Sequence, residues 1–390
     1  MKVLVIGGSG AMGRAAVRAA LSFDFIQEIV VAGIDVEIAT RFVDSLSDAR
    51  VHCIYLDVMD RPKLLDAMRQ VDVVLNAAGP FFRFGVPILS AAIETAKHYC
   101  DICDDWQPTV EMLALHQQAQ QKNITAIIGL GASPGVLNLL CAQAAAELDQ
   151  VDQIVSAWKL SGAVNADDGF SPAPAIGAVD AAAVHLMHCL SEDIQVIEAG
   201  KAIKTRALQH SQIDFPKLGP IDVWSLGHPE AITLPRTYTQ LQQCYNGMLE
   251  IGDIVDDLRQ MADAVAAGQL SVDDAARALT SAESRDSRQQ QLGQHAQSSI
   301  PNALAFAAGI KNGQAKRVGA YFKHSPAGGM ATITGIPLAL FLPLLHGGHL
   351  KQSGVFAPEQ VIEPQVFFDL FDPFCGAQGA GVTVLSSTDA

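Results

Sequence analysis

A glycine-rich turn near the N-terminus constrains this chain more than any other feature. The strand-like run Val3–Ile6 is followed at once by Gly8-Ser9-Gly10-Ala11-Met12-Gly13, which opens a helical pattern. In such a strand–turn–helix unit the first glycine permits a tight turn, the second lets the backbone approach a diphosphate, and the third lets the helix pack on the strand. The free amide groups and the helix dipole then favour a negative charge. We therefore expect these six residues to bind a dinucleotide cofactor.

The next 120 residues repeat the alternation of strand and helix that this turn begins. Strands are expected at 3–6, 29–32, 52–56, 71–75, 98–102 and 124–128, and helices at 13–21, 36–46, 61–70, 85–95 and 108–121. Continuous apolar strands separated by helices indicate a parallel sheet that is buried on both faces. Such units wind right-handed into an open, doubly wound α/β sheet of the Rossmann type. After a predicted helix at 136–148, the half-exposed alternation at 154–160 indicates a second, α+β domain.

Composition excludes several classes of protein. The chain has 390 residues, of which 49% are hydrophobic and 17% charged, so a disordered protein is excluded. The net charge of −15 repels phosphate backbones, which argues against a nucleic-acid partner. The seven cysteines are scattered, as expected of free thiols in a reducing compartment, and no signal peptide is recognisable, so we expect a cytoplasmic protein.

The segment 325–350 contains no Asp, Glu, Lys or Arg and therefore needs comparison with a membrane span. Three prolines interrupt it, and its most apolar run covers only the 15 residues Ala331–Leu345. A spanning helix needs about 20 apolar residues. The segment is therefore predicted to be buried core, and no membrane span is expected.

Three further strand ends are expected to contact the cofactor. Asp35 lies 22 residues after Gly13 and is either an acceptor for the ribose hydroxyls or the N-cap of the next helix. Arg41, on that helix, can reach back toward a 2′-phosphate, so the choice between NAD and NADP stays open. Asp57 and Val58 are predicted to flank the adenine. The small residues expected beside the nicotinamide ribose are Ala77, Ala78, Gly79 and Pro80.

Several sequence motifs together resemble the saccharopine dehydrogenase (saccharopine reductase-like) family. They are Gly8–Gly13, Asn76-Ala77-Ala78-Gly79-Pro80-Phe81, His98-Tyr99-Cys100-Asp101, Gly131-Ala132-Ser133-Pro134-Gly135, Thr334–Ala339 and Gly354–Glu359. The resemblance implies a dinucleotide-binding domain, a second α+β domain and a C-terminal helix that returns to the first. It also implies an NAD(P)-dependent oxidoreductase that forms or oxidises a C–N bond of an amino-acid or polyamine-like substrate by hydride transfer. Ser133 and the pair Asp104-Asp105 depart from motifs common in the family, which puts saccharopine itself in doubt.

The expected domain boundaries follow from these motifs and from the change in pattern. Residues 1–133 are assigned to the dinucleotide-binding domain and residues 134–345 to a domain for substrate binding and oligomerisation, with a homodimer as the default. Residues 346–375 are expected to pack back on the first domain, and residues 376–390 to form a loosely ordered tail.

Hydride chemistry at a C–N bond needs a proton-transferring group and partners for the carboxylates of the substrate. The predicted catalytic residues are Asp101 and Asp105, which follow a strand end; capping and solvent exposure are the alternative. Arg83 is a candidate partner for a carboxylate, because a guanidinium binds one in a bidentate manner. Ser133 and Asn138 contact the substrate or nicotinamide, or merely cap a helix. The remaining predicted substrate contacts are Phe81 and Tyr99.

No metal site is predicted from the sequence. Cys100 and Cys103 lie along a strand, where residues three apart point to opposite faces. His185 and His188 are three apart on a helical pattern without further ligands, so packing or surface placement is expected. An alternative function remains, in which the chain binds a dinucleotide without turnover as a sensor or interaction protein. Its partner surface would then be the polar stretch 253–300.

Overall fold

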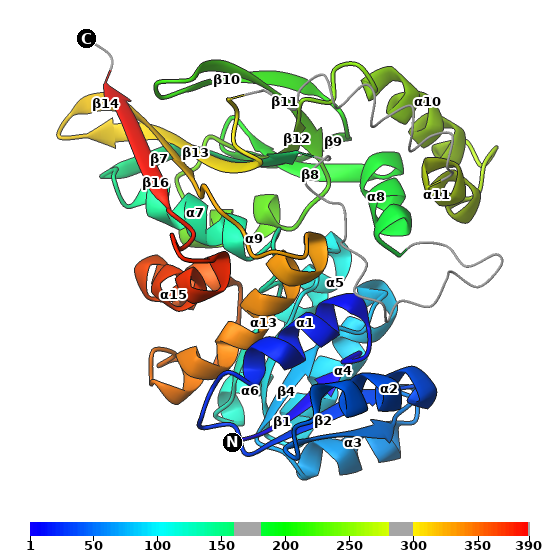
Figure 1. Cartoon of the computed structure of the whole chain (residues 1–390). Coiled ribbons are helices and arrows are strands. Elements are labelled where there is room, and N and C mark those ends of the chain that lie inside the picture. The colour runs from blue at the N-terminus through cyan, green and yellow to red at the C-terminus, as the bar shows by residue number, and fades with distance from the viewer. Residues whose placement is uncertain (160–180, 281–298, 389–390) are drawn as a thin grey trace. The chain divides into compact units, whose positions relative to one another are not determined.

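The chain folds into two units, each with its own sheet and core. The structure is a computed structural model, and it describes residues 1–159, 181–280 and 299–388 (Figure 1). Within these residues, the first unit comprises 1–139 and 324–380, and the second comprises 140–323 and 381–388. Residues 324–345, expected from the sequence in the second domain, lie in the first unit.

The first unit is built on a seven-stranded parallel sheet with the strand order β15-β6-β5-β4-β1-β2-β3. The strands are β1 (Lys2–Ile6), β2 (Glu28–Gly33), β3 (Val51–Tyr55), β4 (Val73–Asn76), β5 (His98–Asp101), β6 (Thr125–Ile127) and β15 (Gly354–Phe356). All four residues of β4 are buried, as are Val3 to Ile6 of β1, because helices cover both faces of the sheet. β2 and β4 lie on opposite sides of β1, so the strand order reverses there. In open sheets this is where ligands bind, at the carboxyl edge.

The helices of the first unit are α1 (Ala11–Ala20), α2 (Val36–Leu46), α3 (Arg61–Arg69), α4 (Phe81–Glu94), α5 (Trp106–Leu113), α6 (His116–Gln121), α13 (Met330–His346), α14 (Pro358–Val361) and α15 (Pro364–Phe371), with a 3₁₀ turn at Asp372–Cys375. The uncharged helix α13 packs along α1 (Figure 1). Their approach depends on Gly335, where a Cβ would lie 2.2 Å from the Met12 carbonyl oxygen. This packing places α13 in the first unit.

In the part of the chain that the structure describes, the second unit contains a nine-stranded mixed sheet and four helices that lie wholly within it. The strands are β7 (Gln150–Lys159), β8 (Asp193–Glu198), β9 (Lys201–Arg206), β10 (His210–Phe215), β11 (Gly219–Leu226), β12 (Gln243–Leu249), β13 (Ala303–Lys311), β14 (Gln314–Tyr321) and β16 (Thr383–Thr388). The helices are α8 (Ala181–Ser191), α9 (Glu230–Thr237), α10 (Val255–Ala266) and α11 (Val272–Thr280), and α7 (Val136–Ala145) spans the boundary of the two units in the sequence. β12 and β7 pair in parallel, whereas the other strands pair antiparallel.

The predicted fold class is confirmed: a doubly wound parallel sheet, a second α+β unit, and a C-terminal helix, α15, that packs in the first unit against α13. Several local predictions differ from the structure. The helix expected at 108–121 is divided into α5 and α6. β7 begins at Gln150 and has four consecutive buried residues, 154–157, because it lies in the middle of its sheet rather than half exposed. The expected tail contains β16, which pairs with β14.

The uncharged segment 325–350 is largely the buried helix α13, as predicted. Across the residues that the structure describes, no helix combines the length and apolar character needed to cross a bilayer.

Candidate functional site

The turn between β1 and α1 is a close-packed backbone cradle. Gly7 has φ of +72°, and a Cβ on it would lie 2.8 Å from the Ala77 carbonyl carbon. The tight turn is predicted at Gly8, but the left-handed residue is Gly7. Gly8 is needed for another reason, since its Cβ would lie 2.9 Å from the Val5 carbonyl oxygen. Gly13 allows α1 to approach the turn: its Cβ would lie 2.1 Å from the Gly7 oxygen.

The outer part of this turn is open to a ligand. Gly8 and Gly13 are buried, whereas Gly10 is exposed and Ser9, Ala11 and Met12 are half-buried. Gly10 is the N-cap of α1, and the first turn of this helix carries no acidic side chain. The positive end of the helix dipole therefore has no carboxylate of its own helix to compensate it. These features fit the diphosphate of a dinucleotide.

Arg14 is a residue of this region that the sequence analysis missed. Its side chain is only 2% exposed, and its guanidinium donates a hydrogen bond to the Ser9 carbonyl oxygen. It therefore supports the turn and adds positive charge next to it. The sequence around Arg14 does not indicate that this side chain is buried, because its burial depends on the packing of α1 against α13 and the sheet.

The ends of β2 and β3 carry the two acids predicted to contact the cofactor. Asp35 is the N-cap of α2, and its Oδ1 accepts the Ile38 N–H at 3.0 Å. Asp57 closes a turn by accepting the Met59 N–H at 2.9 Å. Both follow strand ends at the carboxyl edge of the sheet, with Val58 half-buried beside Asp57. Gly33 leaves space beside the glycine turn, since the Ser9 hydroxyl lies 3.6 Å from where a Cβ would be.

The loop after β4 lies beside the glycine turn. The Ala77 N–H donates to the Ile6 carbonyl at 2.8 Å, so this loop begins next to the end of β1. Ala77 and Ala78 are half-buried, and Gly79 and Pro80 are exposed around a cis peptide bond. The small, accessible backbone predicted for this position is therefore present.

The two predicted substrate contacts in the following helix differ in exposure. Phe81 begins α4 and is buried in the core, with only 6% of its surface exposed. Arg83 is exposed, and its guanidinium lies 5.1 Å from the centre of the Phe84 ring. Only Arg83 is placed to meet a molecule from solvent.

A buried hydrogen-bond chain connects the ends of β4, β5 and β6. The Asn76 amide Oδ1 accepts the Ala78 N–H at 3.0 Å, and its Nδ2 donates to the Tyr99 hydroxyl at 3.0 Å. Tyr99 in turn donates to Asp101 Oδ2 at 2.8 Å. The other oxygen of Asp101 accepts the backbone N–H groups of Cys103 at 3.0 Å and Gly129 at 2.8 Å. These hydrogen bonds therefore fix the loops after β4, β5 and β6 relative to one another.

The surroundings of Asp101 favour a positioning role. Asp101 and Tyr99 are both 0% exposed, and burial raises the pKa of the Asp101 carboxyl to about 6 against the lowering effect of its hydrogen bonds. Burial together with the Asp101 charge raises the pKa of Tyr99 well above its usual range. Neither side chain is accessible to a substrate in this arrangement, although both were predicted to contact one.

The remaining predicted residues lie near the N-termini of α5 and α7. Asp105 is half-buried at the N-cap of α5, and Ser133 is half-buried before a cis peptide bond to Pro134. Asn138 is buried: its Oδ1 accepts the Gly135 N–H at 2.9 Å and its Nδ2 donates to Glu359 at 2.9 Å. Its contact with Glu359, 221 residues away, connects α7 to α14 and could not be predicted from the sequence.

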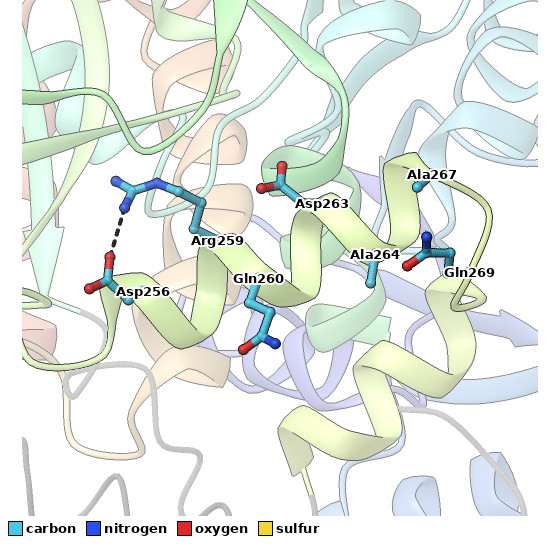
Figure 2. Close-up of a pocket in the computed structure, with 7 residues that line it drawn as sticks. All are labelled: Asp256, Arg259, Gln260, Asp263, Ala264, Ala267 and Gln269. Atoms are coloured by element: carbon cyan, nitrogen blue, oxygen red, sulfur yellow. Dashed lines mark hydrogen bonds and ion pairs between the residues drawn. The ribbon is translucent and has the colours of Figure 1, made fainter.

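The polar stretch 253–300 forms α10 and α11 as far as residue 280, and residues 281–298 lie outside the described part of the chain. Figure 2 shows a shallow surface hollow along α10, where Arg259 pairs with Asp256 at 2.8 Å. Asp263, on the same helix, pairs with Arg206 at 2.9 Å. At the start of α11 the Ser271 hydroxyl accepts the Asp274 N–H at 3.0 Å. This surface is a solvated helix face.

Comparison with known proteins identifies relatives of this architecture. Residues 3–127 match the family model described as saccharopine dehydrogenase NADP binding domain. Carboxynorspermidine synthase from Vibrio cholerae is 26% identical over 266 residues, which cover 60% of this chain and 59% of that protein. The chain thus matches less than two thirds of the length of this relative. The apo structure of saccharopine dehydrogenase (L-Glu forming) from Saccharomyces cerevisiae has the same fold, with a TM-score of 0.63 and 16% identity over 100% of both chains.

Proposed function

Because this chain belongs to the saccharopine dehydrogenase family, we propose that it is an NAD(P)-dependent oxidoreductase acting on a C–N bond of an amino-acid or polyamine-like substrate. The observation that carries the proposal is the glycine turn, where the exposed Gly10 caps a helix whose first turn has no acidic residue. The family model supports NAD or NADP as the cofactor. The relation to a carboxynorspermidine synthase supports an amine substrate.

The proposed roles of the residues follow from their burial and contacts. The backbone around Gly10 holds the diphosphate, and the accessible loop Ala77–Pro80 lies against the nicotinamide half. A bound nicotinamide cofactor supplies or accepts the hydride. Asp101 keeps the loops after β5 and β6 in position through its bonds to Cys103 and Gly129.

Asp105 and Arg83 are the proposed groups that meet the substrate. Both lie after strands at the carboxyl edge of the sheet, and neither is buried. A carboxylate at Asp105 can hold an ammonium or take its proton, and the Arg83 guanidinium can bind a carboxylate. Ser133, in the next loop, is a further proposed polar contact.

The test is a screen of amines paired with keto acids or aldehydes, in which NADPH or NADH consumption is followed by absorbance and binding by calorimetry. We expect one pair to give turnover, which Gly10→Asp abolishes because its carboxylate opposes the diphosphate. Asp105→Asn should lower kcat while leaving the cofactor Kd unchanged, and Asp273→Asn, at an exposed position of α11, is the matched surface control.

Two outcomes contradict the proposal in different ways. If Gly10→Asp binds both cofactors as tightly as the parent, the dinucleotide site is assigned to the wrong place. If the parent binds a cofactor but oxidises none across the whole panel, the alternative of a dinucleotide sensor replaces the enzyme. Full turnover by Asp105→Asn removes only that residue from the mechanism.

A further inference from the structure

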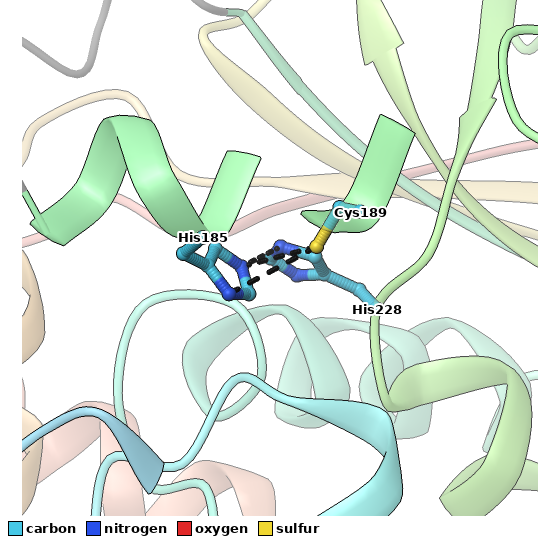
Figure 3. A group of neighbouring side chains, drawn as sticks. All are labelled: His185, Cys189 and His228. Carbon is cyan, nitrogen blue, oxygen red and sulfur yellow. Dashed lines mark hydrogen bonds between the residues drawn. The ribbon is translucent and has the colours of Figure 1, made fainter. Parts of the chain in front are cut away.

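A second group of chemistry-bearing side chains lies in the second unit. His185 and Cys189 are four residues apart on α8, so both lie on one face of this helix. His228 comes from the segment between β11 and α9, 43 residues beyond His185. Figure 3 shows the three side chains pointing toward one another. The sequence analysis left His185 without further ligands because this meeting depends on the fold.

The distances between the donor atoms match a common metal centre. His185 Nε2 lies 3.1 Å from His228 Nε2 and 3.3 Å from Cys189 Sγ, and all three donor atoms lie within 4.8 Å of one another. Zinc–nitrogen bonds of about 2.0–2.1 Å and zinc–sulfur bonds of about 2.3 Å, at tetrahedral angles, require separations of roughly 3.4 Å and 3.6 Å. The two distances from His185 Nε2 are within 0.3 Å of these values, and the third separation, between Cys189 and His228, is at most 4.8 Å, so side-chain rotations are needed to close the site.

A polar chain behind His228 resembles the outer shell of a metal site. His228 Nδ1 faces Glu230 Oε2 at 3.7 Å, and the Glu230 side chain is 0% exposed. The Asn246 amide donates to the other Glu230 oxygen at 3.2 Å and to the Ser156 hydroxyl at 2.9 Å. The separation between His228 and Glu230 is longer than a hydrogen bond, so a small side-chain rotation is needed before the Glu230 carboxylate can fix the tautomer of His228 and orient its opposite nitrogen toward a metal. Here the opposite nitrogen is Nε2, which faces His185.

The surroundings are those of a core rather than a solvated surface. Cys189 and His228 are each 6% exposed, and Cys189 belongs to the main apolar cluster of the second unit. The indole of Trp158 lies 6.0 Å from the His228 ring. A shared cation would offset the cost of burying three polar groups that converge in such a region.

We propose that His185, Cys189 and His228 form a binding site for a divalent transition metal of the zinc class. Two imidazoles and one thiolate are ligands that zinc and cobalt accept, whereas calcium and magnesium prefer oxygen. Three protein ligands leave a fourth position for solvent or a small ligand. The site joins α8 to the segment that precedes α9, and it does not depend on the dinucleotide function.

The test is a titration of the tag-free full chain with Co²⁺ under reducing conditions, followed by competition with Zn²⁺. We expect one equivalent of Co²⁺ per chain, with the d–d bands of a four-coordinate ion and a thiolate charge-transfer band. Cys189→Ser should remove the charge-transfer band, and His185→Ala should weaken binding at least tenfold. Glu230→Gln should weaken binding by about 10–100-fold with the same spectrum, as expected of a group that orients a ligand.

Matched controls separate this site from other histidines and from the cofactor. His188→Ala should bind Co²⁺ like the parent, because His188 lies on the same helix but pairs with Glu192 at 3.1 Å. Gly10→Asp should also bind Co²⁺ normally. The proposal is overturned if the parent takes up no stoichiometric Co²⁺, or if Cys189→Ser and His185→Ala match the parent in affinity and spectrum. The parent titration decides the matter even if a variant fails to fold.

Discussion

Replacing Gly13 by alanine tests whether the glycine turn is a packed backbone contact. The added Cβ would lie 2.1 Å from the Gly7 carbonyl oxygen, 0.9 Å inside the 3.0 Å limit that Cβ atoms respect. The helix α1 cannot retreat, because on its other side α13 already approaches at Gly335, where a Cβ would lie 2.2 Å from the Met12 oxygen. Overpacking of this kind costs about 1–3 kcal/mol, and the blocked retreat places Gly13→Ala at the upper end.

The expected net loss of stability is smaller than the overpacking cost. Alanine within a helix is favoured over glycine by about 1 kcal/mol, so a net loss of roughly 2 kcal/mol remains. For a unit of this size it corresponds to a fall in Tm of about 4–8 °C. Differential scanning calorimetry of the cofactor-free chain measures this change.

Gly10→Ala is the matched control at the same turn. Gly10 has φ of −73° and ψ of 167°, which alanine adopts without strain, and its Cβ would have one close contact, at 3.2 Å. We expect a stability loss of no more than about 1 kcal/mol from the poorer N-cap, but at least tenfold weaker NADP binding. An unchanged Tm for Gly13→Ala, or equal losses for the two variants, would refute the reasoning.

Three further predictions concern other buried groups. In Asp101, the native carboxyl keeps its proton up to a pKa of about 6, above the usual 3.8. As the pH rises from about 4 to 6, the unfolded chain releases this proton before the native chain does, so the free energy of unfolding of the parent should fall by roughly 3 kcal/mol. Asp101→Asn should not show this fall. Equal pH slopes for the two proteins in urea titrations would contradict the prediction. Lys159 pairs with Glu250 at 2.9 Å with both side chains nearly buried, so Lys159→Met alone should destabilise the second unit by about 3–5 kcal/mol. Thermal unfolding should show a smaller loss for the double variant Lys159→Met, Glu250→Gln, and equal losses would argue against the pair. Gly335→Ala should lower the Tm of the first unit by several degrees, because its Cβ would meet backbone, and an unchanged Tm would show that α13 can shift.

Most of the first sheet was predictable because its signals are local. Each buried parallel strand is a short apolar run, and each helix has its own apolar period, so the elements from β1 to β6 were predicted within a few residues. The helix at Val36–Leu46 was predicted with these same bounds. The glycine turn was equally readable, since its spacing reflects the geometry of a single strand–helix connection.

The roles of individual side chains in the candidate site were less predictable. Asp101 looked like an accessible acid because it follows a strand, but it is buried by the neighbouring strand ends. Gly7 and Gly8 are adjacent glycines, and which of them takes the left-handed conformation depends on the approach of Ala77 from another strand. The accessibility of a side chain depends on which residues pack around it, and those residues come from distant parts of the sequence.

The parallel sheet and the position of the glycine turn could be predicted from the amino-acid sequence, because hydrophobic period and turn chemistry act over a few adjacent residues. The packing of α13 on α1, the Asn138–Glu359 contact and the meeting of His228 with His185 became visible in the folded chain. These contacts join segments tens to hundreds of residues apart. Such contacts form only when the whole core of a unit packs, and no short stretch of sequence specifies that packing.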